Sequence, residues 1–269
     1  MTPVLDAAGL RKSFGGQTAV DDVSFRVGAG EIRALIGPNG AGKSTCFNLL
    51  NGQLRPDGGS VRLHGRDITG LPPWRIARLG VGRTFQITAT FASMTVRENV
   101  QTALLSHRRR IWRCGRPARS LFRAEADGLL RQVHLPDQAD RAAGVLAYGD
   151  LKRLELAIAL AGQPVLLLMD EPTAGMAPAE RGALMRLVRA LTRQQAIAVL
   201  FTEHDMDVVF GTADRIMVLD HGRLIADGDP AAVRANPRVR AVYLGSVGPG
   251  SIDPGSIDLG SIDPGGTAC

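Results

Sequence analysis

Lysine, cysteine and aromatic residues are scarce in this chain of 269 residues. Phe, Trp and Tyr together make up 4% of it, and three lysines stand among 32 basic residues. The three cysteines, Cys46, Cys114 and Cys269, have no spacing typical of a metal site. An odd number of cysteines in a chain without an export signal fits a reducing cytosol.

Long hydrophobic runs are also absent. No run approaches the ~18–20 apolar residues of a transmembrane helix, and the longest clear one, PVLLLMD, has the length of a strand. The N-terminus MTPVLDAAGLRKSF lacks the charged start and apolar stretch of a signal peptide, so none is expected. A hydrophobic content of 45% is ordinary for a globular protein with a sizeable core, in one large domain or two small ones.

The excess of positive over negative charge comes from one segment. The net charge is +6, but residues 101–124 hold seven arginines and no acid, so the remainder carries −1. Two interpretations stay open: a solvated loop and helix, or a surface near lipid head groups. Nucleic acid is not expected, because the segment has few aromatic side chains to stack on bases. The seven are Arg108, Arg109, Arg110, Arg113, Arg116, Arg119 and Arg123.

The order of strand and helix patterns predicts an α/β protein. β-rich patterns fill residues 3–36 and GSVRLHGRDI, which suggests a small antiparallel subdomain. Thr95 and Glu98 form a capping box, so a helix is expected to begin there and residues 96–135 to be mostly helical. Later strands alternate with helices, as in a mainly parallel sheet. The expected later elements are a helix after LAYGD, VLLLMD, a helix at about 178–194, AIAVLFTE, RIMVLD and RLIADG.

The C-terminal residues 246–269 differ from the rest. SVGPG, SIDPG, SIDLG and SIDPG follow one another with a period of five residues. Pentads rich in Gly, Ser, Asp and Pro offer too little apolar area to offset the entropy of ordering. We therefore expect a disordered pentad-repeat tail.

The strongest motif is GPNGAGKST at residues 37–45, which matches G-x-x-x-x-G-K-[ST] between an expected strand and an expected helix. Its glycines let backbone N–H groups turn inward around phosphates, and the helix directs its positive end at the same anion. Lys43 would reach the β and γ phosphates, and the Ser44 hydroxyl would bind Mg²⁺. The predicted nucleotide-binding residues are Asn39, Gly40, Ala41, Gly42, Lys43, Ser44 and Thr45.

A second acidic motif completes this chemistry. VLLLMD ends at Asp170, at the C-terminal end of an expected buried strand, and Glu171 follows directly. Asp170 is the expected acidic partner of the metal. Glu171 is well placed to polarise a water for in-line attack on the γ-phosphate.

These motifs and their order resemble the nucleotide-binding subunits of ABC transporters, over about residues 4–245. The resemblance implies a P-loop NTPase fold with a RecA-like core, an antiparallel β subdomain and a helical subdomain at about 87–160. It further implies residue roles. Phe14 would stack on adenine with Val20 nearby, and Gln86 would sense the γ-phosphate and Mg²⁺. Glu171 would be the general base, Asp170 a metal-binding acid, and His204 would steady the γ-phosphate and the attacking water.

Several segments resemble one branch of that family, the branched-chain amino acid importer ATPases. They are GVGRTFQ, FASMTVRENV, YGDLKRLELA, DEPTAGMAP and DPAAVRANPRVRAVYLG. Importers of urea, short amides or aromatic acids use similar ATPases, so the substrate stays open. A soluble ABC ATPase acting on ribosomes or DNA, or a regulatory subunit with weak hydrolysis, are the alternatives from other classes.

LAYGD stands where the family has its LSGGQ signature, which serves the ATP of a partner subunit. Ala147 replaces the serine whose hydroxyl contacts the γ-phosphate, Tyr148 replaces a glycine, and Asp150 replaces a glutamine. Gly149 and the start of the following helix are retained. Ala177 stands where the family has an aspartate between the two sites. The signature therefore keeps its backbone geometry and loses side-chain donors.

The resemblance also implies partners. With one P-loop, the chain would need a second ATPase subunit, a copy of itself or a paralogue, to complete its sites with ATP and Mg²⁺. Two membrane permeases would contact the surface near Gln86 and receive substrate from an external binding protein. The chain would be a peripheral protein on the cytoplasmic face of the bacterial inner membrane.

Overall fold

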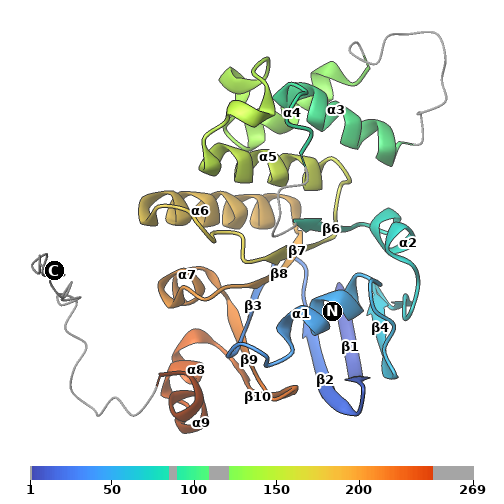
Figure 1. Cartoon of the computed structure of the whole chain (residues 1–269), viewed down its shortest axis with the longest axis vertical. Helices are drawn as coiled ribbons and strands as arrows, with labels where there is room; N and C mark the ends of the chain where they lie inside the picture. Colours follow the sequence, from blue (N-terminus) through green and yellow to red (C-terminus); the bar gives the residue numbers. More distant parts are fainter. Residues whose placement is uncertain (1, 85–89, 109–120, 245–269) are drawn as a thin grey trace, which may run out of the picture.

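The computed structural model describes residues 2–84, 90–108 and 121–244. Its elements are arranged as a central sheet, a second small sheet beside it, and helices on both sides (Figure 1). In the described residues the strands are β1 Leu5–Phe14, β2 Gln17–Val27, β3 Ile32–Ile36, β4 Gly58–Leu63, β5 Arg66–Asp67, β6 Val81–Thr84, β7 Leu166–Asp170, β8 Ala198–Thr202, β9 Arg215–Asp220 and β10 Arg223–Gly228. The α-helices are α1 Lys43–Leu50, α2 Pro73–Arg78, α3 Val96–His107, α4 Arg123–Gln132, α5 Tyr148–Leu160, α6 Pro178–Gln195, α7 Met206–Thr212, α8 Pro230–Ala235 and α9 Pro237–Val239.

The central sheet has the strand order β10-β9-β3-β8-β7-β6. Every neighbouring pair is parallel except β9 and β10, which form an antiparallel hairpin. In a parallel sheet the strands end at one common edge, so the loops after β3, β7 and β8 meet there. The expected parallel α/β core is confirmed.

The small sheet has the order β2-β1-β4-β5, and all its pairs are antiparallel. Its strands come from the β-rich patterns of residues 3–36 and of GSVRLHGRDI. The antiparallel subdomain expected from those patterns is thereby confirmed.

Helices α3, α4 and α5 pack against one another above the central sheet in Figure 1. The predicted capping box is present, because the Thr95 side chain accepts from the Glu98 N–H and the Glu98 carboxylate accepts from the Thr95 N–H. The helical subdomain limits of about 87–160 stay our interpretation. Gln86, five of the arginines between 109 and 120, and the pentad tail lie outside the described residues.

Two hydrophobic cores meet at the central sheet, because successive side chains of a strand point to opposite faces. In β8, Ala198 and Leu200 join the core shared with α1 and the small sheet. Val199 and Phe201 join the core under α3 to α6. The P-loop helix and the helical layer are therefore held by different cores, on opposite faces of one sheet.

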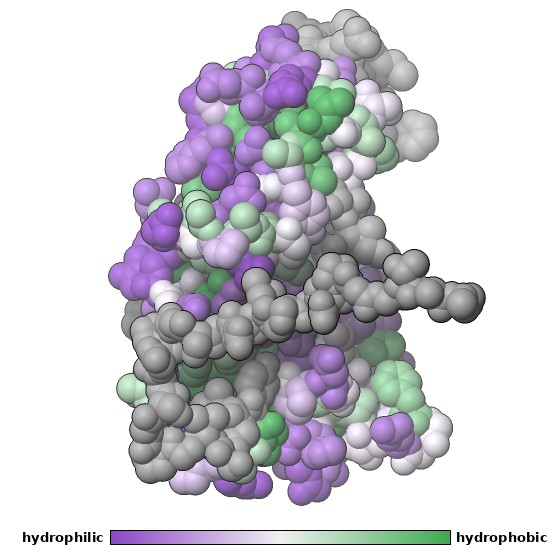
Figure 2. All heavy atoms as spheres, turned by 60° about the vertical axis from the view of Figure 1, so that its left-hand side comes forward, coloured by the Kyte–Doolittle hydropathy of each residue, from purple (hydrophilic) through white to green (hydrophobic). Residues whose placement is uncertain are grey.

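On the face drawn in Figure 2, hydrophilic side chains predominate over the helical layer and hydrophobic side chains form small patches. Within residues 2–84, 90–108 and 121–244, no helix combines the length and apolar character of a membrane span.

Candidate nucleotide site

The loop between β3 and α1 depends on glycines. Gly40 and Gly42 have φ values of 81° and 103°, in the left-handed region that favours glycine. A Cβ atom on Gly42 would lie 2.2 Å from the carbonyl oxygen of Ala19. Gly42 is also the N-cap of α1, so the free N–H groups at the N-terminus of this helix lie next to the loop. This arrangement is suited to bind phosphate.

Lys43 is held inside that loop. Its Nζ donates to the carbonyl oxygens of Gly37 at 2.6 Å and Pro38 at 3.1 Å, and the residue is 8% exposed. Burial lowers the pKa of Lys43, while the charges of Glu171 and Asp170 oppose that effect. The structure therefore brings Lys43 into the electrostatic field of both predicted acids.

Asp170 ends β7, and both of its carboxylate oxygens accept hydrogen bonds. The hydroxyl of Thr202 donates to Oδ1 at 2.7 Å, and Nη2 of Arg83 donates to Oδ2 at 3.3 Å. Thr202 is the register partner of Asp170 on the neighbouring strand β8. Strand pairing thus orients the predicted metal-binding acid.

Glu171 has a φ of 48°, a left-handed conformation that costs of order 1–3 kcal/mol for a residue other than glycine. Its N–H donates to the backbone oxygen and the hydroxyl of Thr202, each at 3.1 Å. Its Oε1 lies 2.9 Å from Nε2 of His204. The backbone turn is therefore held in place, and it aims the predicted base at the predicted histidine.

Three supporting residues escaped the sequence reasoning: Arg83, Thr202 and Glu203. Glu203 is 3% exposed and accepts from the N–H of Thr173 at 2.7 Å and its hydroxyl at 2.6 Å. This contact ties the loop after Asp170 to the end of β8. Thr202 and Glu203 directly precede His204 in the sequence, which is a signal for their position. Their partners, Asp170 and Thr173, follow only from strand pairing.

The LAYGD turn begins α5, with Ala147 as an N-cap that offers no side-chain hydrogen bond. The Asp150 carboxylate lies 3.7 Å from Nη1 of Arg153, one turn along its own helix. Tyr148 is 43% exposed, and its ring lies so near Gly175 that a Cβ there would meet it at 3.4 Å. The acid that could repel phosphate therefore faces an arginine.

The remaining predicted residues lie as follows. Phe14 ends β1, is 47% exposed, and has Nζ of Lys12 at 5.5 Å from its ring centroid. Val20 is fully buried, so Phe14 alone of the two presents a face to a base. Asn39 and Ser44 are exposed, and Thr45 is half-buried. Residues 147–150 begin α5 in the helical layer, apart from α1 in Figure 1.

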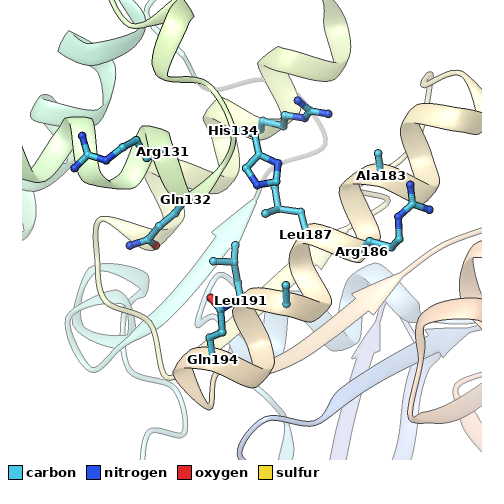
Figure 3. A pocket seen from close by; sticks show the side chains of 10 residues that line it. Arg131, Gln132, His134, Ala183, Arg186, Leu187, Leu191 and Gln194 are labelled. Atoms are coloured by element: carbon cyan, nitrogen blue, oxygen red, sulfur yellow. The ribbon is translucent and has the colours of Figure 1, made fainter.

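Two hollows lie among the helices. A groove of about 500 Å³ lies between α2, β6, α3 and α5 and includes Gln53, Trp74, Arg83 and His107 in its lining. A second hollow of about 500 Å³ lies between the end of α4, α5 and α6, where the His134 ring points toward Leu187 (Figure 3). In β6 the first is lined by Val81, Gly82 and Arg83.

The residues present fit a magnesium nucleotide. The glycine loop leaves open space at Gly40, where an added Cβ would meet no atom within 4 Å. Mg²⁺ prefers oxygen ligands and uses one or two carboxylates together with substrate phosphates. Asp170 and Ser44 offer a carboxylate and a hydroxyl of that kind. Among the described residues, no group of three or more His, Cys, Asp or Glu side chains gathers as a metal site.

Known families and proteins match most of this chain. The sequence model described as ABC transporter matches residues 20–174, and the one described as branched-chain amino acid ATP-binding cassette transporter matches residues 223–248. The branched-chain amino acid transport ATP-binding protein BraF of Pseudomonas aeruginosa is 41% identical over 250 residues, covering 90% of this chain and 98% of BraF. LivG of Escherichia coli, with the same description, is also 41% identical over the same shares.

Solved structures match the chain as well. An ABC-transporter ATP-binding cassette in its ADP conformation is 32% identical, with a TM-score of 0.81, covering 91% of this chain and all of that one. The chain belongs to the ATP-binding subunits of ABC transporters, in the family of the branched-chain amino acid transport ATPases.

Proposed function

We propose that this chain hydrolyses ATP with Mg²⁺ to drive an importer of branched-chain or other hydrophobic amino acids. The proposal for the substrate is supported by the 41% identity to BraF and LivG over 90% of the chain. The proposal for the chemistry rests on one observation above all, the 2.9 Å contact between Glu171 and His204 beside the P-loop strand.

Each residue has a task in this mechanism. Lys43 and the N–H groups at the start of α1 bind the phosphates. Ser44 and Asp170 would hold Mg²⁺ with Gln86, and the ion would neutralise charge on the β and γ phosphates. Glu171 accepts the proton of the attacking water. His204 fixes the Glu171 carboxylate and would steady the γ-phosphate and the attacking water. Phe14 stacks on the adenine.

The proposed assembly has two ATPase subunits, since LAYGD lies apart from the P-loop of its own chain. The signature of each subunit, Ala147 to Asp150, would close on the ATP of its partner through backbone N–H groups. Two permeases would dock at the groove between α2, β6, α3 and α5, where Trp74 is 52% exposed. Closure would pass to them on the cytoplasmic face of the bacterial inner membrane, and a binding protein would supply substrate outside.

The test is Glu171→Gln in the transporter reconstituted with its permeases and binding protein. Loss of a general base lowers turnover by roughly 100-fold or more, while ATP binding is retained. Uptake of labelled leucine by the Glu171→Gln transporter should stop when ATP turnover is lost. The wild-type transporter should take up no labelled sugar. Turnover near the wild-type rate rejects Glu171 as the main base. Wild-type ATPase activity that no hydrophobic amino acid stimulates rejects the substrate.

A further inference from the structure

Arg83 is anchored independently of the acid that it contacts. It lies in β6, its side chain is 15% exposed, and its Nη1 donates to the amide oxygens of Asn48 at 2.9 Å and Gln53 at 2.6 Å. Asn48 belongs to α1, and Gln53 follows that helix. These two neutral acceptors fix the guanidinium in one place without neutralising its charge. The charge therefore acts on the neighbouring side chain.

The neighbour of this fixed charge is Asp170. Nη2 of Arg83 lies 3.3 Å from Oδ2, and the Asp170 side chain is only 12% exposed. No other ion pair to this carboxylate occurs within residues 2–84, 90–108 and 121–244 at a distance of 4 Å or less. Burial lowers the pKa of Lys43, and the charge of Asp170 opposes that effect. Nζ of Lys43 is nevertheless bonded to the carbonyl oxygens of Gly37 and Pro38.

We propose that Arg83 is a positioning residue that serves as the fixed countercharge of Asp170 and weakens its hold on Mg²⁺. This inference rests on the proposed role of Asp170 as a metal-binding acid. A largely buried carboxylate without a neighbouring cation is costly, so Arg83 offsets the charge of Asp170 and orients its side chain before the metal binds. The same positive charge repels Mg²⁺ at the opposite oxygen, which keeps the ion exchangeable between turnovers.

The location of Arg83 adds a consequence. Arg83 and its anchor Gln53 both line the groove between α2, β6, α3 and α5. A partner that docks in this groove and forms a hydrogen bond with the Gln53 amide would weaken the hydrogen bond from Arg83 to Gln53 and free the guanidinium to move. The groove and the metal-binding acid therefore share one side chain.

The experiment uses full-length protein carrying Glu171→Gln, so that ATP is not consumed. The melting temperature is measured at saturating ATP while Mg²⁺ is raised from zero, for the parent and for the added changes Arg83→Gln and Arg83→Lys. We expect Arg83→Gln to melt lower without Mg²⁺ and to need about tenfold less Mg²⁺ for half of the thermal shift, because the repelling charge is gone. Arg83→Lys keeps a charge and should stay near the parent.

Arg33→Gln is the matched control. Arg33 is also buried and ion-paired, with Glu31 and Asp227, but it lies at the start of β3, away from the P-loop that follows the strand. It should lose stability with no change in the Mg²⁺ requirement. If Arg83→Gln does not fold, Arg83→Met replaces it, since methionine keeps the packing of the aliphatic stem.

The outcomes separate two failures. An unchanged or higher Mg²⁺ requirement in the uncharged variant, with a normal thermal shift in the parent, overturns the role of Arg83. No Mg²⁺-dependent shift in the parent overturns the proposed metal site itself.

Discussion

Oε1 of Glu171 and Nε2 of His204 lie 2.9 Å apart although 33 residues separate them in the chain. The contact follows from strand pairing. Asp170 and Thr202 are register partners at the ends of β7 and β8. Glu171 and His204 follow these two strand ends, one and two residues further along the chain. The left-handed backbone of Glu171 then turns its side chain toward His204. Parallel pairing thus brings the proposed base, Glu171, and His204 together.

Replacing His204 with alanine should slow hydrolysis while nucleotide still binds. The change removes the group that orients Glu171, and we expect turnover to fall by about 100-fold, within the range for acid–base groups. Phosphate release measures turnover, and a fluorescent ATP analogue measures affinity. His204→Gln keeps a hydrogen-bond donor and should lose less. Equal losses in both variants would show that the donor is not what matters.

Two glycines of the P-loop should differ in their tolerance of alanine. Both have positive φ, so each substitution costs about 1–2 kcal/mol of strain. A methyl group at Gly40 meets open space, whereas at Gly42 it would lie 2.2 Å from a backbone oxygen. We expect Gly42→Ala to lower the free energy of unfolding by more and to abolish ATP binding, as measured by urea denaturation and nucleotide titration. Similar values for the two variants would contradict this reading of the loop.

Serine at position 147 should stabilise the isolated chain. Ala147 is the N-cap of α5 in an extended conformation and has no side-chain acceptor, and Ser there contributes about 1 kcal/mol. Ala177→Ser is the matched control for the stability measurement, because Ala177 caps α6 in the same way. In the assembled transporter, Ala147→Ser should also lower the ATP concentration for half-maximal turnover. A gain in stability without that second effect would argue against a contact between this turn and the ATP of the partner.

Asp205 should make stability depend on pH in acid. Burial raises the pKa of Asp205, but the N–H of Val208, the Arg181 side chain and the N–H of Asp207 outweigh it and hold the pKa below its usual value. A lowered pKa stabilises the fold above the unfolded value of about 3.9, and that stability is lost as the pH falls through the folded pKa. Asp205→Asn should therefore cost about 1 kcal/mol at pH 7 and progressively less below pH 4. Urea denaturation across pH 3–7 measures this, and a pH-independent difference would contradict it.

The local elements could be predicted from the sequence because their signals are local. The glycines and Lys43 of the P-loop, the capping box at Thr95 and Glu98, and the apolar run ending at Asp170 each carry their meaning within a few residues. The order of these motifs also predicts the parallel core and the family, because the ATP-binding subunits of ABC transporters carry the same motifs in the same order. The substrate was open at that level, because no residue of this chain was expected to touch it.

What only the tertiary structure decided is which side chains meet. Arg83, Asn48 and Gln53 carry no motif, yet β6 pairs with β7 and α1 packs beneath the sheet, so the guanidinium reaches Asp170. Thr202 and Glu203 gained their roles from the register of β8 against β7. The alternation of apolar residues along a strand fixes its two faces, but not which strand lies beside it. Only the folded sheet determines which strands are neighbours, and therefore which side chains contact Asp170 and Glu171.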